Sequence, residues 1–146
     1  METALTTRIL LVDDEEEFIT ALGKRLEARN LKVKAATSGE RAIEIVDNEA
    51  VDVIVLDLAM PGMDGLEVLR RIKGDHPEAE IIMLTGHATI EKSVEAMKLG
   101  AEDFLEKPVD IKELLEKIQE AKNKRVLVLQ EKSKAEIELI LKTRAW

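Results

Sequence analysis

The sequence predicts an α/β fold, in which a doubly wound sheet of five parallel strands carries helices on both faces. Two observations lead to this prediction. Short apolar runs, bounded by polar or turn residues, are typical of buried parallel strands. Between these runs lie longer segments with apolar residues at helical spacing, as at Phe18, Leu22 and Leu26. Strand and helix alternate five times, which implies right-handed crossovers and helices on both sides of the sheet.

The strands are predicted from four apolar runs and one shorter segment. Residues 9–12, 53–56 and 81–84 are apolar at every position. Residues 31–36 form a weaker run, and the Asp-Phe-Leu-Glu segment at 103–106 is a short fifth strand.

Capping residues indicate where the helices begin and end. Ser38, Asp64 and Asp110 precede the second, third and fifth helices, where their side chains can accept hydrogen bonds from the first turn. Gly74 and Gly100 stand where the third and fourth helices are expected to end.

Composition excludes several classes of function. The 146 residues suit one domain, and the absence of cysteine excludes disulfides, thiolate zinc sites and thiol catalysis. No apolar stretch is long enough to cross a bilayer, and the first residues do not resemble a signal peptide. We therefore expect a cytoplasmic protein with no membrane contact. A formal net charge of -8 argues against direct binding of nucleic acid.

Chemically active residues follow the predicted strands. Asp13 and Asp14 follow the first strand, Asp57 the third, Thr85 the fourth and Lys107 the fifth. All five therefore lie at the edge of the sheet where ligands bind in such folds. Converging carboxylates repel one another unless a cation joins them, and oxygen ligands favour a hard ion such as Mg²⁺. The lysine and the threonine hydroxyl suit a phosphoryl group, so the set accommodates a phosphorylated carboxylate.

The segments "LLVDDEE", "VLDLAMPGMDG", "LTGHA" and "DFLEKP" together resemble the receiver domain of bacterial two-component response regulators, over roughly residues 8–118. The resemblance implies the flavodoxin-like strand order 2-1-3-4-5, which is the order found in receiver domains. It implies that Asp57 accepts a phosphoryl group from a sensor histidine kinase or a phosphotransfer protein. Asp14 would bind Mg²⁺ directly, Asp13 would assist through water, and the backbone carbonyl of Ala59 would be a further ligand.

The same resemblance also indicates which residues would respond to the phosphorylation of Asp57. Lys107 would pair with the phosphoryl oxygens and Thr85 would hydrogen-bond to them. Phe104 stands at the position of the family's switch aromatic, and Lys107-Pro108 matches its cis peptide bond. Phosphorylation would change the surface formed by the fourth helix, fifth strand and fifth helix, and so control partner binding or dimerisation.

Two further residues are expected to set the lifetime of the phosphoryl group. In receiver domains, the positions two beyond the phosphorylated aspartate and two beyond the threonine flank the site. Here they are Ala59 and His87, and Ala59 offers no side-chain group to orient a water molecule.

Residues 119–146 differ from the receiver domain predicted for residues 1–118. They carry 7 Lys and Arg against 4 Asp and Glu, and no proline or glycine follows Pro108. We expect the fifth helix to continue through this extension and to contribute to a homodimer, because its apolar residues need partners. The apolar spacing is not a clean heptad, so an imperfect coiled coil and a linker from a longer regulator both fit.

Two other functions remain as alternatives. A receiver-like binding module that works without phosphorylation would have lost an acid or the lysine, and neither is lost. A Mg²⁺-dependent hydrolase that forms an aspartyl-phosphate would typically show Asp-x-Asp, but the second position here is Ala59. The sequence therefore predicts a phosphoacceptor that reacts on itself, and not an enzyme that turns over an external substrate.

Overall fold

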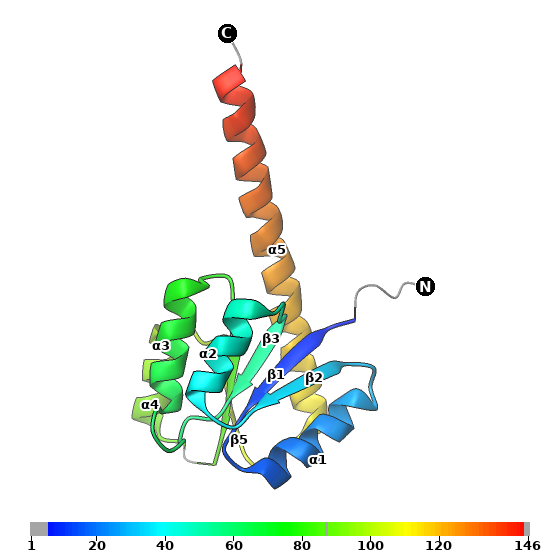
Figure 1. The fold of residues 1–146 in the computed structure, drawn as a ribbon, viewed down its shortest axis with the longest axis vertical. Coiled ribbons are helices and arrows are strands. Elements are labelled where there is room, and N and C mark those ends of the chain that lie inside the picture. The colour runs from blue at the N-terminus through cyan, green and yellow to red at the C-terminus, as the bar shows by residue number, and fades with distance from the viewer. Residues whose placement is uncertain (1–5, 87, 145–146) are drawn as a thin grey trace.

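The computed structural model describes residues 6–86 and 88–144, and within them the chain forms a parallel sheet of five strands (Figure 1). The strand order is β2-β1-β3-β4-β5, which confirms the predicted fold. The strands are β1 (Arg8–Val12), β2 (Lys32–Ala36), β3 (Val53–Leu56), β4 (Glu80–Thr85) and β5 (Asp103–Glu106).

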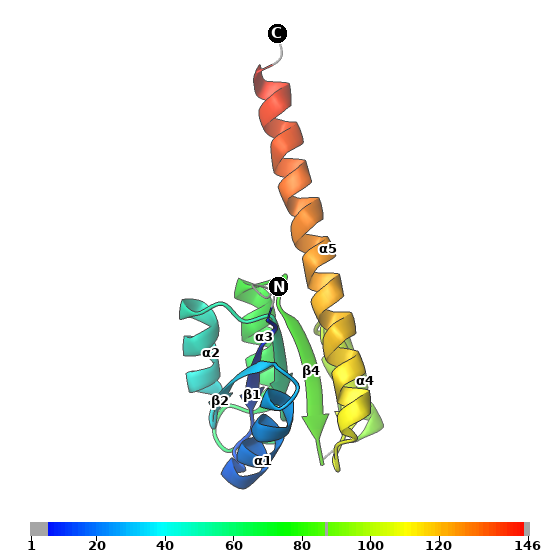
Figure 2. The same ribbon diagram turned by 90° about the vertical axis from the view of Figure 1, so that its right-hand side faces the viewer.

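Helices cover both faces of this sheet (Figure 2). The helices are α1 (Glu16–Glu27), α2 (Gly39–Asn48), α3 (Gly65–Asp75), α4 (Ile90–Lys98) and α5 (Ile111–Arg144). Successive strand residues point to opposite faces, so Leu10 joins a core with α2, α3 and α4 while its neighbour Leu11 joins a core with α1 and α5. Because both faces of the central strands are buried, β1, β3 and β4 each contain four consecutive apolar residues.

Two details differ from the prediction in ways that burial and backbone explain. The run at residues 31–36 was predicted as a strand of the buried type, but the observed β2 strand lies at the edge of the sheet and is largely exposed. This exposure is why its apolar run is the weakest. Gly74 does not end α3, since the helix continues through Asp75 and the His76 N–H still donates to the Ile72 carbonyl. Gly100 does follow α4, with a φ of 106° that suits glycine.

The predicted caps are present. The Ser38 and Asp64 side chains accept hydrogen bonds from Arg41 N and Glu67 N. Asp110 Oδ1 accepts from two N–H groups in the first turn of α5.

The α5 helix is longer than the domain that it covers. Its first turns pack on the sheet through Leu114, Ile118 and Ala121, and its later turns project past the amino-terminal ends of the strands (Figures 1 and 2). Eight large apolar side chains on the projecting part are exposed: Val126, Leu127, Val128, Leu129, Ile137, Leu139, Ile140 and Leu141.

Polar contacts attach α5 to this end of the sheet just before it projects. Lys122 Nζ donates to Thr7 Oγ1 at 2.8 Å, and Lys124 Nζ donates to Glu102 Oε2 at 2.7 Å. Arg125 Nη1 lies 3.3 Å from Asp52 Oδ1. Among the described residues, no helix combines the length and the apolar character needed to cross a membrane.

Candidate functional site

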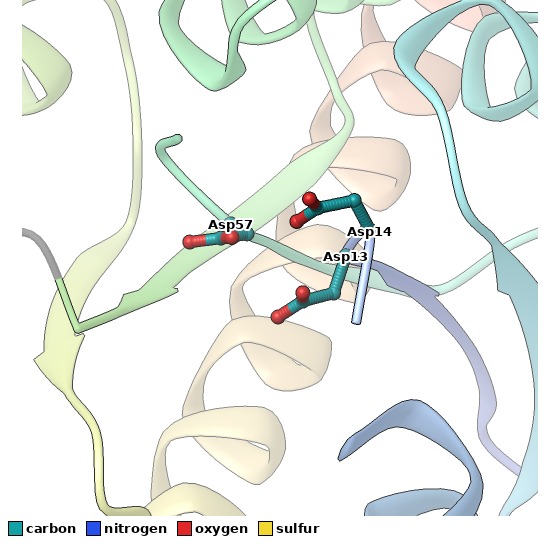
Figure 3. A group of neighbouring side chains, drawn as sticks. All are labelled: Asp13, Asp14 and Asp57. Atoms are coloured by element: carbon teal, nitrogen blue, oxygen red, sulfur yellow. The ribbon is translucent and has the colours of Figure 1, made fainter. Parts of the chain in front are cut away.

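Three carboxylates gather at the carboxyl ends of β1 and β3 (Figure 3). One oxygen from each of Asp13, Asp14 and Asp57 lies within 4.8 Å of the others. Asp13 and Asp57 are each only 3% exposed, whereas Asp14 is open to solvent. Asp57 N donates to the Val12 carbonyl at 2.8 Å, so the ladder between the two strands fixes the first residue beyond β3. Asp57 is therefore positioned directly by two neighbouring strands in the middle of the sheet.

A glycine behind Asp57 allows the chain to fold back tightly. A Cβ at Gly65 would overlap the carbonyl oxygen of Asp57 and would lie 2.7 Å from Leu58 Cα. Gly65 N donates to the Leu58 carbonyl at 2.7 Å, and Gly62 in the intervening turn has a φ of 75°. The amino-terminal end of α3 can therefore lie directly against the backbone that carries Asp57.

Lys107 reaches into the carboxylate cluster from the end of β5. Its Nζ lies 2.7 Å from Asp13 Oδ2 and 2.9 Å from Glu15 Oε1. The same Nζ lies 4.1 Å from the centroid of the Phe18 ring, within the range of a cation–π contact. The Lys107 side chain is 14% exposed, so its aliphatic part is packed while its charged end meets the acids.

The pKa values at the site reflect this crowding. Burial raises the pKa of Asp13, the Lys107 ammonium opposes that rise, and the nearby Asp57 adds to it. Burial alone would lower the pKa of Lys107, but hydrogen bonds to Asp13 and Glu15 outweigh it and the net direction is upward. Lys107 is therefore a permanent positive charge at the site at neutral pH.

The surroundings of Asp57 Oδ1 favour a bound cation. Asp57 Oδ1 is buried and has no hydrogen-bond partner in the described part of the chain. A buried ionised oxygen is costly unless a cation or a donor meets it, and two further carboxylates lie beside this one. Because oxygen donors of this kind are the ligands of hard divalent ions, the donor set fits Mg²⁺.

The other predicted residues surround this cluster. Thr85 is fully buried at the end of β4, and its carbonyl accepts a hydrogen bond from Lys107 N at 2.9 Å. Ala59 is half-buried in the chain after Asp57. The Lys107-Pro108 peptide bond is cis. His87 lies outside the described residues.

Phe104 faces a groove that none of the three acids lines. It is half-buried on β5 and lines a groove of about 730 Å³ between α4 and β5. Ile90, Val94 and Met97 of α4 line the same groove and are exposed.

Comparison with known proteins agrees with this arrangement. Residues 9–119 match the family model described as the response regulator receiver domain. The chain belongs to this family. The photosynthetic apparatus regulatory protein RegA of Rhodobacter capsulatus is 38% identical to this receiver chain over 106 residues, which is 73% of the chain and 58% of RegA.

A second relative and a solved structure extend the likeness. The C4-dicarboxylate transport transcriptional regulatory protein DctD of Pseudomonas aeruginosa is 35% identical over 127 residues, covering 87% of this receiver chain and 28% of DctD. A CheY-like receiver domain from Methanospirillum hungatei superposes with a TM-score of 0.79 at 32% identity, covering 82% of this chain and 96% of that one. The receiver chain thus spans only part of the length of either curated relative.

Sequence reasoning did not find the surroundings of Lys107. Glu15 fits the general preference for acids at the start of a helix, yet its carboxylate faces Lys107. Phe18 fits the apolar face of α1, yet its ring lies against the lysine ammonium. Glu15 directly follows two site residues at a strand end, and this position was the available signal.

Proposed function

We propose that this receiver domain is a phosphorylation switch, in which Asp57 accepts a phosphoryl group from a sensor histidine kinase or a phosphotransfer protein in the presence of Mg²⁺. The observation that carries the proposal is the buried Oδ1 of Asp57, which has no hydrogen-bond partner among the described residues. It lies beside two further carboxylates, of which Asp13 contacts Lys107.

The reaction follows from the positions of these groups. An oxygen of Asp57 attacks the phosphorus of the donor, and an O–P bond forms. The bond from phosphorus to the leaving group breaks, and the leaving group keeps the electron pair. Lys107 provides a positive charge that offsets the negative charge of the phosphoryl oxygens.

The metal would be held by Asp14 and Asp57, by the backbone carbonyl of Ala59, and by Asp13 through water. When bound, Mg²⁺ supplies positive charge that lets two anions approach each other.

The readout begins at Thr85 and Phe104. A phosphoryl group on Asp57 adds about 1.5 to 2 negative charges close to the buried Thr85. The Thr85 hydroxyl can then turn toward a phosphoryl oxygen, which leaves space for the half-buried Phe104 ring to move inward. Such a movement changes the groove between α4 and β5, and with it the surface formed by α4, β5 and α5.

The output in this proposal is a contact between proteins. Residues 1–118 act as the receiver unit and residues 119–146 as a helical extension, whose exposed apolar side chains support a homodimer. The α4–β5–α5 surface is the second candidate for this contact. A cytoplasmic location, the absence of direct nucleic-acid binding, and the tuning of the phosphoryl lifetime by Ala59 and His87 stay predictions of the same proposal.

Intact-protein mass spectrometry tests the switch directly. The wild type and Asp57→Asn are each incubated with acetyl phosphate and Mg²⁺. We expect one phosphoryl group on the wild type and none on the variant, since acetate leaves as Asp57 bonds to phosphorus. Sizing of the same samples then shows whether phosphorylation changes self-association. Equal labelling of both proteins, or of neither, would contradict the proposal.

A further inference from the structure

The Glu15 side chain contacts Lys107 rather than the helix that begins after it. It is the N-cap residue of α1, but its side chain makes no capping hydrogen bond to the helix. Its Oε1 instead lies 2.9 Å from Lys107 Nζ. The contact joins the loop after β1 to the residue after β5, beside the carboxylate cluster.

Lys107 therefore has two acidic partners, of which Asp13 is a candidate metal ligand and Glu15 is not. A cation held by Asp14 and Asp57, with Asp13 beside it, would offset the Asp13 charge and weaken its attraction for Lys107. Glu15 lies outside the carboxylate cluster, so its attraction for the lysine persists after the cation has bound. When the lysine turns toward a phosphoryl group on Asp57, it acts against the attraction of this remaining partner.

We propose that Glu15 is a positioning residue that holds Lys107 in its resting direction and slows the capture of a phosphoryl group by Asp57. This inference rests on the proposed phosphorylation of Asp57. Glu15 does not touch the reacting atoms and acts through the lysine. The packing of the Lys107 ammonium on the Phe18 ring, 4.1 Å away, supports the same resting direction.

The size of the effect is limited by exposure. Glu15 is 64% exposed, so solvent and salt screen its attraction for Lys107. Exposed ion pairs of this kind correspond to about a twofold to fivefold change in an equilibrium or rate. Glu15 therefore slows the phosphorylation of Asp57 only modestly, and added salt reduces this effect.

The chain offers a matched control within the same turn. Glu16 and Glu17 follow Glu15, are exposed, and have no contact with Lys107 among those that the structure describes. Glu16→Gln removes the same charge as Glu15→Gln at almost the same distance along the chain. Because the Glu15 side chain does not cap α1, Glu15→Gln should leave the fold intact.

The first measurement is the initial rate of labelling by acetyl phosphate with Mg²⁺, at low and at high salt. We expect Glu15→Gln to react about twofold to fivefold faster than the wild type at low salt, and at about the same rate at high salt. Glu16→Gln should match the wild type under both conditions. Equal acceleration by Glu15→Gln and Glu16→Gln would overturn the proposal, because net charge alone would then explain the rate. An unchanged rate for Glu15→Gln would overturn it too.

Two further measurements do not depend on turnover. Beryllium trifluoride, a mimic of a phosphoryl group, should bind about twofold to fivefold more tightly to Glu15→Gln than to the wild type in calorimetry with Mg²⁺. Nuclear Overhauser effects between the Lys107 ε protons and the Phe18 ring should weaken in Glu15→Gln and persist in Glu16→Gln. The chain has 2 phenylalanines, which simplifies the assignment. Unchanged Overhauser effects in Glu15→Gln would contradict the positioning role. A wild type that is never labelled would instead refute the phosphorylation switch itself.

Discussion

Asp57 is held where an ionised carboxylate is unfavourable without a cation. Its Oδ1 is buried without a partner among the described residues, and two other carboxylates lie within 4.8 Å. Lys107 compensates only in part, because its ammonium is already shared between Asp13 and Glu15. The metal-free site therefore subtracts from the stability of the fold.

Replacing Asp57 should make the metal-free protein more stable. We expect Asp57→Asn to raise the free energy of unfolding without Mg²⁺ by about 1 to 3 kcal/mol, since one of three crowded charges is removed. Added Mg²⁺ should raise the thermal midpoint of the wild type and have little effect on the variant. Calorimetry with and without the ion measures both. Asp75→Asn, an exposed position at the end of α3, is the control, and an equal Mg²⁺ response in all three proteins would contradict the expectation.

Glu80 gives the protein a second ionisable group with an unusual environment, far from the acids at the carboxyl edge. It is 5% exposed at the start of β4, and burial together with the Glu102 carboxylate raises its pKa to about 7, against the pull of Lys124 and Lys73. The folded protein keeps this proton up to about pH 7, while an unfolded chain releases it near 4.5. The folded state therefore binds more protons in this window, and its stability falls as the pH rises from 4.5 to 7.

Glu80→Gln should remove the fall in folding stability with rising pH, because the glutamine side chain resembles protonated glutamate and does not titrate. We expect the variant to gain on the order of 2 kcal/mol over the wild type between pH 5 and pH 8. Urea unfolding across this range measures the difference. Glu116→Gln, exposed on α5, should follow the wild type. A constant difference between Glu80→Gln and the wild type at all pH values would show that Glu80 does not titrate in this window.

At the scale of single residues, the sequence predicted side chains whose role depends on following a strand. Asp13, Asp14 and Asp57 are brought together because parallel strands end at one edge. Glu15 and Phe18 were not predicted as partners of Lys107, because their contacts depend on side-chain directions that spacing along the chain does not determine.

At the scale of elements, strand and helix boundaries follow from burial and capping. The central strands were predictable because each contains four consecutive apolar residues, and β5 was predicted with its observed bounds. Gly74 was placed wrongly because a glycine ends a helix only where the backbone needs a positive φ. Gly100 meets this condition, whereas Gly74 is not among the residues with positive φ that the structure records.

The two glycines of α3 should respond in opposite directions to alanine. Gly65→Ala places a methyl group against the backbone of Asp57 and Leu58, so we expect a loss of about 3 kcal/mol or more and a weaker Mg²⁺ site. Gly74→Ala meets nothing within 4 Å, and we expect a gain of about 0.5 to 1 kcal/mol from helix propensity. Chemical unfolding compares the pair. Similar effects at both positions would show that the close approach at Gly65 does not matter.

At the scale of the whole molecule, the projecting part of α5 is the feature that a single receiver unit does not explain. Its apolar side chains are exposed, while Lys122, Lys124 and Arg125 attach the helix to the sheet just before it projects. The direction of the helix is therefore set by the domain, and its exposed apolar side chains support the proposed contact with a second copy.

Substitutions on one face of the projecting helix test self-association. Leu127 and Leu141 are two heptads apart and both are exposed. We expect the double variant Leu127→Lys and Leu141→Lys to weaken the dimer at least about tenfold, since two charges would enter an apolar contact. Gln130→Lys adds a charge to the same stretch at a polar position and should have little effect. Analytical ultracentrifugation measures all three proteins, and a wild type that stays monomeric at high concentration would contradict the expectation.

The unbroken course of α5 also has a mechanical consequence. The helix begins a few residues after Lys107, passes the contacts at Lys122, Lys124 and Arg125, and continues for residues 126–144 without interruption. Those 19 residues span about 28 Å, so they form a rigid lever arm with its fulcrum at the three contacts. A tilt of about 5° at the fulcrum displaces the tip by roughly 2 Å, enough to move a side chain out of register with a facing helix. The helix from Ile111 to these contacts is the shorter of the two arms, so a movement of its first turn would be slightly enlarged at a tip that lies beyond the opposite edge of the sheet.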